Sequence, residues 1–146
     1  RRVLITAASM GVKEIFLIGA KAVEKSYWQS HALHAEAIHE QLLLGLEQGM
    51  DTRLPRVRTQ PRFRHFLEAQ LSGIRGDAPV YIAHPDPIVN LPEGSTESAV
   101  LVIGPEAGWT DDEMDRWDAL GAERLSLGGR PLRVEAAVPA LLSRML

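Results

Sequence analysis

The sequence of 146 residues contains no cysteine. This absence excludes a disulfide framework, a thiolate metal site and a cysteine nucleophile. The sequence also has no apolar run of membrane length and no signal-peptide pattern, so we expect a cytoplasmic protein without a membrane partner. Neither G-x-x-x-x-G-K-[ST] nor G-x-G-x-x-G occurs, which excludes two common nucleotide-binding fingerprints. With 45% hydrophobic and 24% charged residues, the chain is expected to form one domain with a sizeable core.

The five histidines do not form a recognisable metal motif. His31 and His34 are three residues apart and His39 follows five residues later, but no carboxylate is placed as in H-E-x-x-H. We therefore predict no metal.

The charge is distributed unevenly along the chain. Its formal net charge is −3, yet the charged residues before position 76 are mainly basic and those after it mainly acidic. A basic face can exist on an acidic protein, so the net charge does not exclude nucleic acid as a partner.

An arginine-rich stretch occupies residues 51–65. Two prolines exclude a continuous helix, so we expect a loop with a short extended segment at 56–59. Arg53, Arg56 and Arg58 are candidates for phosphate contacts, which would give salt-sensitive RNA binding. The alternative is a solvated charged loop.

Hydrophobic periodicity predicts helices alternating with short apolar strands, which is typical of an α/β fold with a mostly parallel sheet and flanking helices. Gly49 is expected to cap the second helix, and Pro139 to kink or break the last one. The segment 21–34 shows no clean period and is expected to be a loop with a short helical turn. The expected helices span 3–10, 35–48, 63–71, 110–120 and 134–146, and the expected strands span 14–19, 79–83, 99–103 and 124–127.

The stretch from 99 to 137 contains two glycine-bearing loops that each follow a strand and precede a helix. The first loop starts at Gly104 and ends in a capping box, with Thr110 at the N-cap and Glu113 three residues later. The second loop spans 128–133. An open α/β sheet holds ligands in such loops, at the carboxyl ends of its strands.

These two blocks carry a resemblance to a known family. IGPEAGW at 103–109 and LGGRPLRVE at 127–135 resemble the paired signature of SPOUT-superfamily RNA methyltransferases. The closest match is the family that methylates N3 of a uridine in bacterial small-subunit (16S) ribosomal RNA. This chain departs from that signature at four positions, Ala107, Pro131, Val134 and Ala136.

The resemblance implies a fold and an assembly that periodicity does not reveal. It implies a SPOUT-type α/β fold over residues 1–146 whose C-terminal segment threads through a loop as a trefoil knot. It also implies a homodimer formed through the last helix, which carries an apolar face. The chain begins without Met, and the resemblance implies that a PUA-like β-barrel RNA-binding domain and the first strand of this domain lie upstream.

The resemblance further implies S-adenosyl-L-methionine as the cofactor, held against glycine backbone and apolar walls. Glu106 is expected in a buried loop, where it caps backbone amides, bonds the ribose or faces the substrate. The candidate cofactor-binding residues are Ala83, His84, Ile103, Gly104, Glu106, Gly108, Leu127, Gly128 and Leu132.

Methylation of uridine N3 requires loss of a weakly acidic proton, which a base or a nearby cation assists. Arg130 or Arg133 is a candidate for that cation or for a phosphate contact, and Glu135 for orienting the arginine. The alternative is a structural Arg–Glu ion pair. The alternative for the whole domain is a non-catalytic RNA-binding or ribosome-assembly module that retains the fold, and the four departures keep it open.

Overall fold

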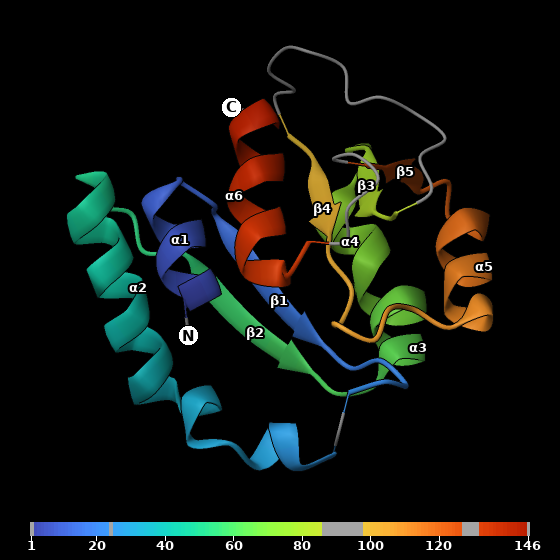
Figure 1. Ribbon diagram of the computed structural model, residues 1–146, viewed down its shortest axis with the longest axis horizontal. Helices are drawn as coiled ribbons and strands as arrows, with labels where there is room; N and C mark the ends of the chain where they lie inside the picture. The colour runs from blue at the N-terminus through green and yellow to red at the C-terminus, as the bar shows by residue number, and fades with distance from the viewer. Residues whose placement is uncertain (1, 24, 86–97, 127–131, 146) are drawn as a thin grey trace.

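The computed structural model describes residues 2–23, 25–85, 98–126 and 132–145. Helices and short strands alternate over most of this length (Figure 1). The elements are α1 (Arg2–Ser9), β1 (Glu14–Ile18), the short helices η1 (Lys25–Gln29) and η2 (His31–Leu33), α2 (Ala35–Gly49), β2 (Arg56–Gln60), α3 (Phe63–His65), η3 (Phe66–Gln70), α4 (Leu71–Arg75), β3 (Val80–Ala83), β4 (Val100–Val102), α5 (Asp111–Ala119), β5 (Glu123–Leu125) and α6 (Val134–Met145).

All strand pairs in the described residues are parallel, as predicted. β3 lies between β4 and β5, and β1 pairs separately with β2. The extended segment predicted at 56–59 within the arginine-rich stretch is confirmed, because residues 56–60 form the strand β2. Its pairing with β1 was not predicted. β1 supplies a hydrogen-bonding partner along its length, with Glu14 opposite Arg56 and Ile18 opposite Gln60.

Both faces of the three-stranded sheet are covered, which explains why β3 and β4 read as continuous apolar runs. On one face, Val80, Ile82 and Val102 pack against side chains from η3, α4 and α5. On the other face, Tyr81 and Leu125 pack against the inner side of α6. The sheet is therefore a buried layer between helices, and only its ends remain open to a ligand.

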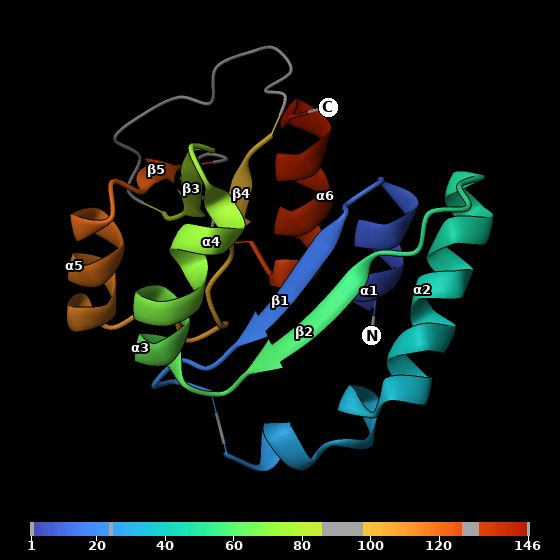
Figure 2. The same cartoon turned by 180° about the vertical axis from the view of Figure 1, so that it is seen from behind.

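The β1–β2 pair has its own helical cover, formed by α1 and α2 (Figure 2). Ile15 and Val57 pack on a cluster of buried residues from these two helices. Gly45 lets α2 approach α1 closely, because a Cβ there would meet the Ile5 carbonyl and the Ala8 side chain. Ile38, Leu42 and Gly45 are thus buried on the side of α2 that meets α1.

Two details of the helices differ from the predictions, one at the end of α2 and one inside α6. Gly49 belongs to α2, and the C-cap is Met50 in the left-handed conformation, with φ of 51°. Its N–H reaches the carbonyls of Leu46 and Glu47, and these bonds offset the strain of a non-glycine residue there. Pro139 does not interrupt α6, which runs from Val134 to Met145.

No helix within the described residues combines the length and the hydropathy needed to cross a bilayer. Residues 86–97 and most of the predicted glycine loop at 128–133 lie outside the described residues. The threading of the C-terminal segment, and with it the knot, therefore stays a prediction.

Candidate functional site

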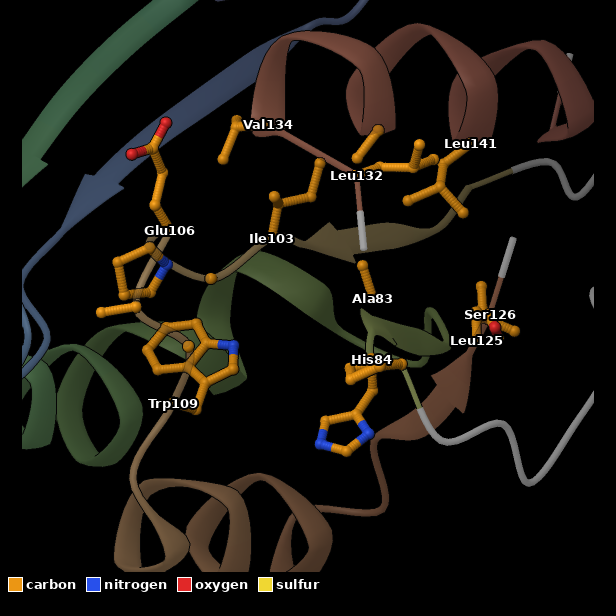
Figure 3. A pocket seen from close by; sticks show the side chains of 16 residues that line it. Ala83, His84, Ile103, Glu106, Trp109, Leu125, Ser126, Leu132, Val134 and Leu141 are labelled. Atoms are coloured by element: carbon orange, nitrogen blue, oxygen red, sulfur yellow. The ribbon is translucent and has the colours of Figure 1, made fainter. Parts of the chain in front are cut away.

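A cavity of about 400 Å³ opens at the carboxyl ends of β3, β4 and β5 (Figure 3). Its volume lies within the range of small-molecule sites, and most of its side chains are apolar. Three parallel strands ending at one edge explain its location, since loops from neighbouring strands meet there. The lining residues are Ala83, His84, Pro85, Ile103, Gly104, Pro105, Glu106, Ala107, Gly108, Trp109, Leu125, Ser126, Leu132, Val134, Ala137 and Leu141.

The loop after β4 begins with a tight turn. The Gly108 N–H donates to the Pro105 carbonyl at 2.8 Å, and Gly108 has φ of 81°, which favours glycine. Glu106 occupies a corner of this turn and is exposed at the rim of the cavity. The prediction of a buried Glu106 was wrong, because the corner of a turn directs its side chain outward.

The indole of Trp109 packs against the start of this loop at Gly104. Its ring lies 5.5 Å from that of Phe63 and 5.7 Å from that of Trp117, measured between centroids. A Cβ at Gly104 would lie 2.6 Å from Trp109 Nε1, so only glycine lets the strand end approach the indole. Trp109 is partly buried and packs against the core cluster, and it also lines the cavity.

The predicted capping box at the start of α5 is confirmed. Thr110 Oγ1 accepts from the Glu113 N–H at 3.2 Å, and Glu113 Oε1 accepts from the Thr110 N–H at 2.9 Å. Sequence reasoning missed a third bond, in which Glu113 Oε2 accepts from the Lys21 N–H at 3.1 Å. Glu113 is 5% exposed. One buried carboxylate therefore ties the loop after β1 to the loop of the cavity.

The structure brings the described cofactor candidates together. Those from the ends of β3 and β4, and Leu132 before α6, all line the cavity, whereas Leu127 and Gly128 lie outside the described residues. Sequence reasoning missed Ser126 and the α6 residues Ala137 and Leu141. Ala137 and Leu141 are four residues apart and therefore lie on one face of a helix. This spacing did not reveal whether that face contacts the sheet or a ligand.

The three catalytic candidates have a different status. Arg133 and Glu135 are exposed at the start of α6, and neither lines the cavity. The Arg133 carbonyl accepts from the N–H groups of Ala136 and Ala137, and the described residues show no ion pair between Arg133 and Glu135. Arg130 lies outside the described residues.

The three RNA-binding candidates lie along or before β2 and are all exposed. Arg56 opens the strand, Arg58 lies at its centre, and Arg53 precedes it. Asp51 Oδ1 accepts from the Arg53 N–H at 3.0 Å and from the Thr52 N–H, and these bonds hold the pKa of Asp51 below its usual value. Arg53 and Arg56 are therefore at the opposite end of the parallel strands from the cavity (Figures 1 and 2).

Known proteins share the sequence and the fold. A family model described as an RNA methyltransferase domain matches residues 1–146. The "Ribosomal RNA small subunit methyltransferase E" of Treponema pallidum is 32% identical over 151 residues, covering 100% of this chain and 56% of that protein.

Two solved structures share this arrangement. A putative Legionella pneumophila methyltransferase, in complex with the bound cofactor S-adenosylmethionine, matches with a TM-score of 0.78 and 26% identity, over 97% of this chain and 58% of that one. A Neisseria gonorrhoeae ribosomal RNA small subunit methyltransferase E bound to S-adenosylmethionine gives 0.77 and 22%, over 99% and 58%. The chain thus spans little more than half the length of these relatives.

Proposed function

Because the chain belongs to the RNA methyltransferase domain family, with a SPOUT-type fold, we propose that it is the S-adenosylmethionine-dependent part of an enzyme that methylates N3 of a uridine in small-subunit (16S) ribosomal RNA. The cavity at the strand ends is the observation that carries this proposal. It gathers residues 103–109 of the first signature block and Leu132 and Val134 of the second around one space. We propose both S-adenosylmethionine as the cofactor and 16S ribosomal RNA as the substrate.

The residues present fit such a cofactor. Gly104 and Gly108 leave backbone accessible to the polar edges of a ligand, and no Cβ could stand at Gly104 without displacing Trp109. Ile103, Leu125 and Leu132 supply apolar walls for a flat ring (Figure 3). Ala83 and His84 close the side formed by β3. When bound, S-adenosylmethionine supplies an electrophilic methyl group.

The chain itself has to position the nucleobase and assist loss of the N3 proton. We propose that Arg133, which is exposed just before α6, stabilises the negative charge that develops on the uracil ring. We propose Arg130 as a second cation or a phosphate contact and Glu135 as the residue that orients the arginine when RNA is bound. Alignment of the base with the methyl group then supplies much of the acceleration.

We further propose a homodimer through α6. Val138 and Leu141 are already buried within the chain, whereas Leu142 and Met145 remain partly exposed. These two residues continue the apolar side of the helix outward, where the same helix of a second copy would cover them.

We expect the full-length protein to bind S-adenosylmethionine saturably, at one site per chain, in a calorimetric titration. With 16S ribosomal RNA lacking the modification, it should then transfer a methyl group to uridine N3, detected by mass spectrometry of the digested RNA. A folded protein that binds RNA but neither binds the cofactor nor transfers a methyl group would instead establish a non-catalytic RNA-binding module.

The basic residues of β2 give a second prediction. Arg58→Glu is expected to weaken RNA binding and to lower the slope of log Kd against log salt by about 1, because an exposed cation at a phosphate contact is lost. Arg2→Glu, an exposed cation at the start of α1, provides the control for the change in net charge. Equal slopes for Arg58→Glu and the wild type would identify this part of β2 as a solvated face.

A further inference from the structure

The segment between β1 and α2 exposes large rings without forming a core. The one-turn helices η1 and η2 have no buried residue, although they contain a tyrosine and a tryptophan. Tyr27 is 45% exposed, and its ring meets that of Trp28 edge to face, with centroids 5.4 Å apart. Aromatic side chains contribute most when they are covered, so this surface is suited to a partner with flat apolar faces.

The surface continues into a pair of histidines. Nδ1 of His31 lies 3.0 Å from Nδ1 of His34, with ring centroids 4.7 Å apart. Bonds within the segment hold its backbone: Ser30 Oγ accepts from the Ala32 N–H, and the Ser30 carbonyl accepts from the Leu33 N–H. The rings are therefore presented on a locally ordered backbone.

The position of this segment relates it to the cavity. β1 and β2 end at the edge of the molecule beside which residues 25–34 run, and the loop at Gly104 follows the end of β4 on the same side (Figures 1 and 2). The bond from the Lys21 N–H to Glu113 Oε2 joins the start of this connection to the cavity loop. The segment 25–34 therefore lies on the side of the molecule where β1 and β2 end and the cavity loop follows β4.

The charges along this edge suit a polyanion. Lys21 and Lys25 are exposed and precede Tyr27 in the chain by six and two residues. Gly19 packs directly against Pro61, which brings the exposed Arg62 near the same connection. Cations interleaved with aromatic rings favour single-stranded nucleic acid over a protein surface, because phosphates and bases alternate in the same way.

We propose that Tyr27, Trp28, His31 and His34, here called the ring surface, stack on unpaired nucleotides that flank the target uridine. This inference rests on the proposed function and adds a binding subsite to it. Single-stranded bases can stack on aromatic and histidine rings, whereas bases inside a duplex cannot. The part of the chain that the structure describes contains no group of three or more histidine, cysteine, aspartate or glutamate side chains that could hold a metal ion.

The test uses the full-length protein and a fluorescein-labelled, single-stranded RNA of mixed sequence that includes the target uridine. Tyr27→Ala and Trp28→Ala should each raise the Kd about 10-fold, while Tyr27→Phe should bind as the wild type does, because the phenyl ring still stacks. The slope of log Kd against log salt should not change, in contrast to Arg58→Glu, because no cation is lost. A duplex of the same sequence should show no dependence on these residues.

Leu43→Ala is the matched control, because Leu43 is 42% exposed on α2 and lies outside the ring surface. An unchanged Kd for folded Tyr27→Ala would overturn the inference, as would sedimentation showing that Tyr27→Ala converts a dimer to a monomer, which would assign the surface to a second copy. The proposed function is tested separately by cofactor titration and methyl transfer of the wild type. If the wild type fails those two assays but its RNA binding depends on Tyr27, the ring surface is an RNA-binding site and the proposed enzymatic function is wrong.

Discussion

Gly104→Ala is expected to weaken S-adenosylmethionine binding about 10- to 100-fold. The new Cβ would lie 2.6 Å from Trp109 Nε1 and 2.9 Å from Cδ1, so the indole would have to move. Phe63 and Trp117 hold that indole from the other side, and overpacking of this kind typically costs about 1–3 kcal/mol. Displacement of Trp109 changes the shape of the cavity that it lines. Calorimetric titration measures the loss directly.

Gly73→Ala provides the control for this glycine substitution. Gly73 lies within α4, and a Cβ there would have no other atom within 4 Å, so the variant should bind the cofactor as the wild type does. Thermal unfolding of both variants separates a binding defect from a loss of fold. Wild-type affinity in Gly104→Ala would show that the loop adjusts freely and that the cofactor does not lie against Gly104.

Trp117→Ala is expected to lower the free energy of unfolding by about 3–5 kcal/mol. Trp117 has no exposed surface and is the largest fully buried side chain in the described residues. It joins α5 to Phe63 of α3, at 5.8 Å between ring centroids, and to Trp109. Its Nε1 has no hydrogen-bond partner in the structure, so the loss consists of packing and the cavity left behind. Urea denaturation followed by circular dichroism gives the value.

Leu120→Ala is the corresponding control, because Leu120 follows the same helix but is 36% exposed. Its effect should stay within about 1 kcal/mol, as for most surface substitutions. A change of less than 1 kcal/mol in Trp117→Ala would contradict the assignment of this residue to the main core.

The local signals of the sequence predicted the frame of the site well. The run at 99–103 and the capping box at Thr110 and Glu113 produced a strand, a loop and a helix close to the predicted places. Such signals depend on neighbouring residues only: β-branched side chains favour a strand, and a cap satisfies the first N–H groups of a helix. Predictions that required a distant partner were less complete, as at 56–60, where an extended segment was predicted without its partner strand β1.

By itself, the sequence determined the family, the order of helices and strands, and the residues of the loop after β4 that line the cavity, because these follow from motifs and local periodicity. Only the tertiary structure decided that residues 56–60 pair with β1, that Glu106 is exposed, and that Glu113 also binds the Lys21 N–H. Each of these depends on contacts between residues far apart in the chain or on the direction of one side chain at a turn. The pattern of residues along the sequence records neither long-range contacts nor the direction of a single side chain.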